Sequence, residues 1–426
     1  MTPSVPSRAT LSSLGLGLLT LLGCSSTSGS SAGGSSSSGG ESQTHAPMEL
    51  DAAVAASNRF TAELYRTIAQ PHANGAASPY SVAVAFGMTR EGARGETRSE
   101  LDAALHLEGD TTRANAALAE RLATIGASGV ELRTANRVFL EETQSVEPTF
   151  EASMRDGFHA PFERVGFIAD PESSRVRVND WVASQTNDRI RDLLPPASID
   201  GDTRLVLTNA VYFQGTWQTS FDRARTQDLG FFVDGTTPAN VPMMQAERAM
   251  RFGHAEGAAV GELPYTGGEI SMIVVVPDAQ DGLPALLSDL DGDRMQRWID
   301  SLTERPNVIL KLPRFRVAPS ESLALSEPMR SLGVRLAFQS GDADLTGIAT
   351  THPPLFVAEG YHRAFVEVNE EGTEAAAATA VVISTRSAPT RPPQRDELIA
   401  DRPFLFFLRD TRTGAILFVG HVVDPR

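Results

Sequence analysis

Few side chains in this chain have a spacing that could support enzyme chemistry. The stretch Gly29-Ser30-Ser31-Ala32-Gly33 matches the Gly-x-Ser-x-Gly pattern of a hydrolase nucleophile. Such a nucleophile needs a strand before it and a helix after it, and here both flanks are low-complexity Ser/Gly sequence. The eight His residues are scattered, and there is no His-Glu-x-x-His, phosphate-binding loop or Cys/His cluster. Spacing alone leaves open a triad built from distant residues, but no motif indicates an enzyme, a cofactor or a metal site.

The one Cys of the chain lies at the end of an apolar leader. Residues 1–23 carry a single Arg followed by the apolar run Leu11–Leu22, which is too short to span a bilayer and predicts a signal peptide. The boundary Leu21-Leu22-Gly23-Cys24 resembles a bacterial lipoprotein box, in which the Cys thiol is diacylated. The alternative is an ordinary signal peptide with an incidental Cys. We expect lipidation at Cys24, and a lone Cys excludes an internal disulfide.

Composition bounds the remainder of the chain. Its 426 residues are 41% hydrophobic and can bury a sizeable core, and a net charge of −16 argues against non-specific nucleic-acid binding. Residues 24–47 are the Cys and a Ser/Gly tract, a flexible tether with a reach of roughly 25 Å. Length alone favours two or three domains. Because no linker interrupts residues 48–426, we expect one large domain there.

An unusual pattern covers Val368 to Ser387. From Thr373 to Ile383 every second residue is small or apolar, so one face of a strand would be free of charge. No charge, Pro or Gly falls between Ala375 and Thr385, so nothing there prevents β pairing. The same run could instead begin a surface helix, because Ala is the best helix former. The Pro-rich residues 388–395 indicate an exposed loop.

Residues 370–380 read Glu-Glu-Gly-Thr-Glu-Ala-Ala-Ala-Ala-Thr-Ala. This motif resembles the reactive-loop hinge of inhibitory serpins, the serine-protease inhibitors that trap a target by inserting this loop into a sheet. The resemblance implies a reactive loop at about 370–397 and a scissile bond between Arg386 and Ser387. It gives the hinge role to Glu370, Glu371, Gly372, Thr373, Glu374, Ala375, Ala376, Ala377 and Ala378.

Other blocks match the same family from about residue 48 to the C-terminus. Ser78-Pro79-Tyr80-Ser81 is similar to the serpin pattern of a short buried strand that feeds a helix. On their own, Ser78 and Ser81 could be helix caps. The resemblance places them beneath the main sheet, where its central strands part.

Three more residues receive roles from the resemblance. Asn209 falls where a strand would bury a core residue, so it needs polar partners. The resemblance supplies Ser81 and His362 as these partners and makes His362 a structural latch between strands. Trp181 is by itself a plausible core aromatic. The resemblance puts it near the top of the sheet, where the loop first enters.

The pattern of apolar residues predicts both helices and strands. Helical spacing from Phe60 to Ile68 predicts a helix that Pro71 to Gly75 closes. Apolar or alternating runs between Pro, Asp or Gly predict strands at Ile270–Val276, Val308–Leu312, Phe404–Leu408 and Ala415–Val419. The resemblance implies an α+β serpin fold, with several helices around a large central mixed sheet, smaller sheets and an exposed reactive loop.

The function implied by the resemblance is inhibition of a protease. A target serine protease would attack the carbonyl of Arg386, form an acyl-enzyme and be carried on the inserting loop. A guanidinium suits a specificity pocket with a buried carboxylate, so trypsin-like proteases are the expected targets, although cleavage at a small residue of the loop stays open. We expect an exported monomer, held at the outer membrane or cell surface through its lipid anchor alone. The alternatives are a non-inhibitory serpin that binds or stores, and a structural surface lipoprotein.

Overall fold

The described part of the chain holds most of the predicted domain. A computed structural model describes residues 45–107, 117–122, 124–125, 129–233, 237–351, 354–373 and 395–426, which all belong to the unit Thr44–Arg426. Side chains are described from Leu50 onward, except those of Thr134, Ala135, Asn209 and Ala210. No helix within these ranges is long and apolar enough to cross a bilayer.

The helices begin and end at the residue types that the sequence suggests. α1 ends at Ile68, just before Pro71, as predicted. Ser78 caps α2 by accepting a bond from the Ser81 N–H, and Asp170 caps α6 in the same way. The helices are α1 (His45–Ile68), α2 (Pro79–Gly92), α3 (Gly95–Ala104), α5 (Pro148–Ala152), α6 (Pro171–Gln185), α7 (Leu283–Ser288), α8 (Gly292–Asp300) and α9 (Ser326–Ser331), with short turns η1 (Ser153–Gly157), η2 (Arg223–Arg225) and η3 (Leu336–Phe338).

The larger sheet has nine strands in the order β1-β17-β16-β8-β7-β6-β9-β15, with β5 paired to β6. All its pairs are antiparallel except β15 with β9. The four strands predicted from apolar runs are confirmed as β8, β9, β16 and β17. The strands are β1 (Gly75–Ala77), β5 (Gln227–Phe232), β6 (Pro238–Ala255), β7 (Ala258–Pro264), β8 (Ile270–Pro277), β9 (Thr303–Pro313), β15 (Asp396–Ile399), β16 (Phe404–Asp410) and β17 (Ile416–Val422).

The second sheet has six strands in the order β10-β13-β14-β4-β2-β3, and a third sheet pairs β11 with β12. In the six-stranded sheet, β4 and β2 form the longest antiparallel pair, and β3 runs parallel to β2. The strands are β2 (Val130–Glu141), β3 (Phe162–Val165), β4 (Leu205–Thr216), β10 (Phe315–Val317), β11 (Leu323–Ala324), β12 (Tyr361–His362), β13 (Val366–Val368) and β14 (Gly372–Thr373).

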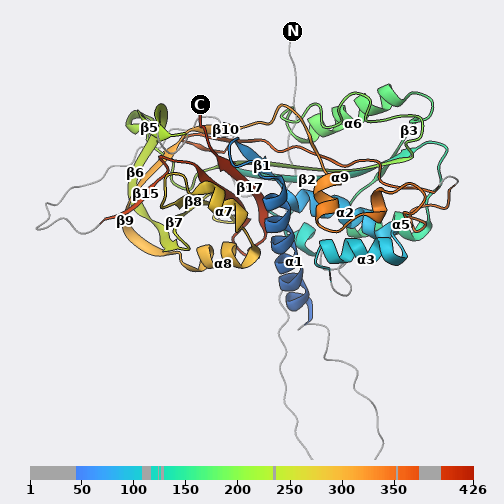
Figure 1. Cartoon of the computed structure of the whole chain (residues 1–426), viewed down its shortest axis with the longest axis horizontal. Helices are drawn as coiled ribbons and strands as arrows, with labels where there is room; N and C mark the ends of the chain where they lie inside the picture. The colour runs from blue at the N-terminus through green and yellow to red at the C-terminus, as the bar shows by residue number, and fades with distance from the viewer. Residues whose placement is uncertain are drawn as a thin grey trace, which may run out of the picture. The chain divides into compact units, whose positions relative to one another are not determined.

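Helices cover both faces of the six-stranded sheet at its β2–β3 end. Figure 1 shows α6 on one side of β2 and β3, and α2, α3 and α5 on the other. A separate core lies between the two sheets and includes Phe213, Tyr265 and Phe406. Helices α1, α7 and α8 bury a third core against β8 and β16. The predicted α+β architecture, with helices around a large mixed sheet and smaller sheets, is confirmed.

Candidate functional site

Two residues of the predicted hinge form a strand inside the six-stranded sheet. Gly372 and Thr373 make up β14, which lies between β13 and β4. Thr373 is opposite Val368 of β13 on one side and opposite Gly215 of β4 on the other, and both pairs are antiparallel. The family resemblance implies that this segment enters the sheet after cleavage. In the uncleaved chain, Gly372 and Thr373 already lie in the sheet.

Gly372 permits the close approach of β14 to β4. Its φ is +153°, and a Cβ at this position would lie 2.0 Å from the carbonyl oxygen of Gly215. Any other residue would therefore force the hinge away from β4. Just before Gly372, the carbonyl of Glu371 accepts a 2.7 Å bond from the N–H of Trp217, which fixes the entry of the chain into the sheet.

The side chain of Thr373 is held in an aromatic pocket. The residue is 1% exposed, and its hydroxyl lies 2.7 Å from the hydroxyl of Tyr265. The Tyr265 ring stacks on Trp217 at 4.5 Å and meets the edge of Phe213 at 4.8 Å. Burial raises the pKa of Tyr265 well above its ordinary value, so its hydroxyl stays protonated. The pocket therefore suits a small side chain with one hydroxyl.

The carboxylate of Glu370 in the hinge is buried, and both of its oxygens accept hydrogen bonds. Glu370 is 1% exposed, and its carboxylate accepts bonds of 2.6 to 2.9 Å from the Arg314 guanidinium and one of 2.5 Å from the Thr226 hydroxyl. Burial raises the pKa of Glu370, but these bonds outweigh burial and hold it below its ordinary value. Glu370 is thus a buried, ionised anchor for the chain before β14.

The carboxylate of Glu371 has fewer hydrogen-bond donors than that of Glu370. Glu371 is 8% exposed, and its Oε1 accepts one bond of 2.5 Å from Nε of Arg223. Its Oε2 is buried without a hydrogen-bond partner among the described residues. The two adjacent hinge carboxylates therefore differ in how many donors satisfy them.

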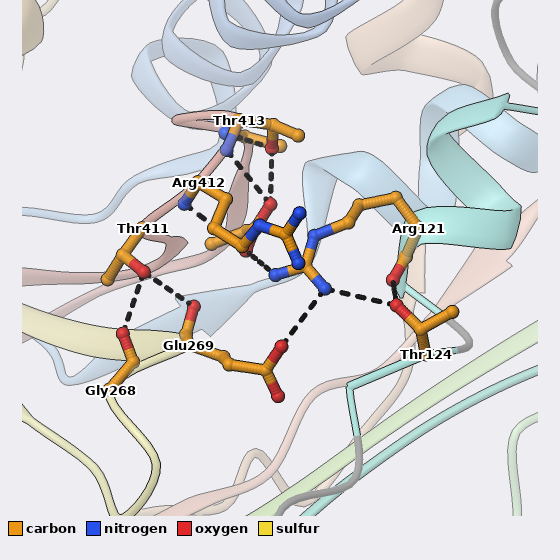
Figure 2. Close-up of polar contacts among 9 residues, drawn as sticks. Arg121, Thr124, Gly268, Glu269, Thr411, Arg412 and Thr413 are labelled. Carbon is orange, nitrogen blue, oxygen red and sulfur yellow. Dashed lines mark hydrogen bonds and ion pairs between the residues drawn. The ribbon is translucent and has the colours of Figure 1, made fainter.

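The turn that contains Tyr265 is held in place by hydrogen bonds from Arg121 and Thr411. This turn runs from the end of β7 to Glu269, and Arg121 of the helical residues 117–122 donates to Glu269 (3.2 Å) and to the fully buried Asp410 (2.7 Å). Figure 2 shows Arg121 beside Glu269, with the Thr411 hydroxyl bonded to the carbonyls of Gly268 and Glu269. The aromatic pocket is thus attached to the frame of the nine-stranded sheet.

One flank of β4 extends well beyond its pairing with the hinge. Thr216 and Gly215 pair with β14, but from Gln214 back to Leu205 this flank has no strand partner among the described residues. A cavity of about 650 Å³ lies there, and its lining includes Leu205, Leu207 and Val211 of β4 as well as residues 354–363. The open flank and the cavity together form a slot in the sheet, which we call the β4 slot.

Three predicted sheet-opening residues line the β4 slot, namely Ser78, Ser81 and His362. The N–H of Ser78 donates a 3.0 Å bond to Nε2 of His362, and the Ser78 hydroxyl donates to the carbonyl of Leu417 at 2.7 Å. Burial lowers the pKa of His362 to about 4, so the imidazole is neutral and its Nε2 can accept this bond. The side chain of Asn209 lies outside the described residues, and its bonds to Ser81 and His362 stay a prediction.

Trp181 has a different setting from the expected one. It lies on α6, packs edge-on against Phe139 at 5.7 Å and stacks with the guanidinium of Arg137 at 5.0 Å. These contacts fasten α6 to the outer face of β2. The tryptophan at the loop entry is Trp217, whose indole N–H donates to the carbonyl of Asn369 at 3.0 Å.

Sequence reasoning missed the residues that hold the hinge. Two adjacent buried acids require basic or hydroxyl partners, but the sequence does not say which of 37 Lys and Arg residues supply them. The missed residues are Trp217, Arg223, Thr226, Tyr265 and Arg314.

Several predicted site residues lie outside the described residues. These are the lipidation site Cys24, the later hinge residues Glu374, Ala375, Ala376, Ala377 and Ala378, and the reactive bond Arg386-Ser387. Within the described ranges, no group of three or more His, Cys, Asp or Glu side chains could hold a metal ion.

Comparisons with known proteins agree with this geometry. A family model described as serpin (serine protease inhibitor) matches residues 55–425. Serpin B4 of Homo sapiens is 35% identical over 368 residues, which are 82% of this chain and 93% of that protein. The leukocyte elastase inhibitor of Sus scrofa is 37% identical over 384 residues, 87% of this chain and 99% of that protein. The solved structure of cleaved serpin 42Da superposes with a TM-score of 0.77 at 30% identity, covering 89% of this chain and all of the other.

Proposed function

The chain belongs to the serpin family, which is described as a family of serine protease inhibitors and not of enzymes, and we propose that it traps trypsin-like serine proteases as covalent acyl-enzymes. The observation that carries this proposal is the position of β14 at the end of the β4 slot. The uncleaved hinge is already paired, and the next residues of the chain would continue along an open strand flank.

The register of β14 specifies how the loop would insert. Thr373 is opposite Gly215, so continued antiparallel pairing would set Glu374 opposite Gln214 and Ile383 opposite Leu205. The inserted strand would end three residues before Arg386. Ten residues at ~3.3 Å each would carry a protease attached at Arg386 by about 33 Å.

The side-chain pattern of the loop fits the β4 slot. Residues 375, 377, 379, 381 and 383 would face the same side as Thr373, toward Leu205, Leu207 and Val211, and they are Ala, Ala, Thr, Val and Ile. None of them is charged, so their burial leaves no unpaired charge. Insertion would also give ladder hydrogen bonds to the open flank of β4.

The chemistry would come from the protease. Its serine oxygen attacks the carbonyl of Arg386, the amide bond to Ser387 breaks, and the proton goes to the new Ser387 amine. The product is an ester between Arg386 and the protease serine. Loop insertion then pulls on this ester and distorts the protease before water can release it. The Arg386 guanidinium suits a specificity pocket with a buried carboxylate, which favours trypsin-like targets.

The reactive bond is tested with trypsin on a denaturing gel. Wild type should give a covalent complex that survives denaturation. Arg386→Ala should give none while keeping the fold, because the sequence predicts an exposed loop at Arg386 and such a residue would contribute no core packing. Arg391→Ala is the matched control, since Pro392 follows it and makes cleavage there poor. A full yield of complex from Arg386→Ala, or loss of complex in Arg391→Ala, would place the scissile bond elsewhere.

We also propose that the mature protein is anchored to a membrane through Cys24. The Leu-Leu-Gly-Cys boundary and the Ser/Gly tract behind it support this, and several acyl chains together give stable anchoring. In cell fractionation, wild type should sediment with membranes and Cys24→Ser should remain in the supernatant. If Cys24→Ser sediments fully with membranes, the anchor lies elsewhere.

A further inference from the structure

The carboxylates of Glu370 and Glu371 in the hinge differ in how many hydrogen-bond donors they have, and this difference bears on how the hinge is held in the sheet. Glu370 has donors on both carboxylate oxygens from Arg314 and Thr226. Glu371 has one charged donor, Arg223, and a buried Oε2 with no partner among the described residues. The burial of Glu371 therefore depends on Arg223.

Glu371 directly precedes the strand that enters the sheet. Its carbonyl is bonded to Trp217, and the next two residues are β14. If the Glu371 carboxylate had to move into water, Gly372 and Thr373 would be pulled from their pairing with β4 and β13. A carboxylate that is buried without a counterion is strongly unfavourable. The hinge should therefore stay in the sheet as long as the negative charge of Glu371 is neutralised.

Arg223 lies where it can respond to solvent. Its side chain is 61% exposed, whereas that of Glu371 is 10% exposed. Dissolved ions can therefore reach the Arg223 guanidinium, and screening by salt weakens the ion pair. Arg225 lies two residues further in the same turn, and its exposed side chain makes no hydrogen bond or ion pair with any described residue.

We propose that the Arg223–Glu371 ion pair is a latch that holds the hinge in the sheet before cleavage, with Arg223 as a positioning residue for loop insertion. The insertion part of this inference rests on the proposed inhibitory function. The position of the hinge in the uncleaved chain does not, so the latch can be tested without a protease.

The first experiment measures amide hydrogen exchange of residues 369–373 in the uncleaved protein. Arg223→Met should raise exchange there by tenfold or more, because the unpaired Glu371 carboxylate moves outward. The double variant Arg223→Met with Glu371→Gln should return to the wild-type rate, because a neutral amide can stay buried. Arg225→Met should equal wild type. Wild-type exchange in Arg223→Met, or a failure of Glu371→Gln to rescue it, would overturn the latch.

A second measurement keeps the test valid if Arg223→Met does not fold. Wild-type exchange of residues 369–373 should rise between low salt and 1 M NaCl, where the Debye length falls to about 3 Å. Glu371→Gln alone should show no such rise. The same salt response in both proteins would overturn the latch.

The third experiment connects the latch to inhibition by trypsin. Arg223→Met should be cleaved at the wild-type rate but should yield several-fold more cleaved product for each trypsin trapped, and the double variant should restore the wild-type ratio. If wild type traps no trypsin, the proposed function fails while the exchange result still decides the latch. If wild type traps trypsin and Arg223→Met equals it in both ratio and exchange, only the latch fails.

Discussion

Thr373 is the residue on which the proposed loop insertion should depend most directly. It is 1% exposed, paired on both sides and bonded through its hydroxyl to Tyr265. In the sequence it is the first residue of the small and apolar face that runs from Thr373 to Ile383. The sequence could not reveal Tyr265, because no spacing rule connects two residues 108 positions apart.

Thr373→Arg should convert the inhibitor into a substrate. A guanidinium in the aromatic pocket would be buried without a counterion, which costs several kcal/mol. Insertion would then be slower than hydrolysis of the acyl-enzyme, so the variant should be cut after Arg386 at the normal rate and released. The measurement is the ratio of covalent complex to cleaved product with trypsin, with Thr373→Ser as the control that keeps the hydroxyl. Equal trapping by Thr373→Arg and wild type would show that this pocket does not govern insertion.

At the scale of elements, the bond from Ser78 to His362 joins the start of α2 to β12 at the edge of the β4 slot. The imidazole must be neutral to accept this bond. Its pKa of about 4 in the folded protein lies below the ordinary value near 6.5. The unfolded chain therefore binds a proton between these pH values while the folded chain does not. Stability from this group is complete above pH 6.5 and decreases as the pH falls toward 4.

His362→Gln should reduce the acid sensitivity of the protein. A glutamine amide oxygen can accept the bond from Ser78 but does not titrate. Between pH 7 and pH 5, wild type should lose about 2 kcal/mol more unfolding free energy than the variant. Urea unfolding at the two pH values measures this difference. His421 is also buried with a lowered pKa, so the variant should keep part of the pH dependence. Identical losses in both proteins would mean that His362 binds protons in the folded state as readily as in the unfolded chain.

The elements differ in how far the sequence could predict them. β8 and β16 were predictable because their burial on both faces requires long apolar runs. β14 was not, since it has only two residues, one of them Gly, and its pairing on one side depends on β4, more than 150 residues earlier. The local sequence of residues 371–380 by itself favours a surface helix. Only the family resemblance indicated a strand there.

At the scale of the whole molecule, the sequence supported one α+β domain, and the described residues form one unit with cores on several sheet faces. The tryptophan at the loop entry was assigned less well. Trp181 lies on α6 and packs on Phe139 of β2, whereas Trp217 contacts the hinge through Asn369, and the sequence does not show this difference. Local patterns thus predicted elements, while the contacts around the hinge depended on how distant elements meet.

The account depends on the β4 slot receiving the loop after cleavage. The most direct measurement is a crystal structure of the protein after cleavage at Arg386. It should show residues 374–383 as a central strand between β4 and residues 358–367, with Ile383 opposite Leu205, as the pairing of Thr373 with Gly215 and with Val368 requires. A cleaved protein whose residues 374–383 remain outside the sheet, with the β4 slot still open, would contradict the mechanism.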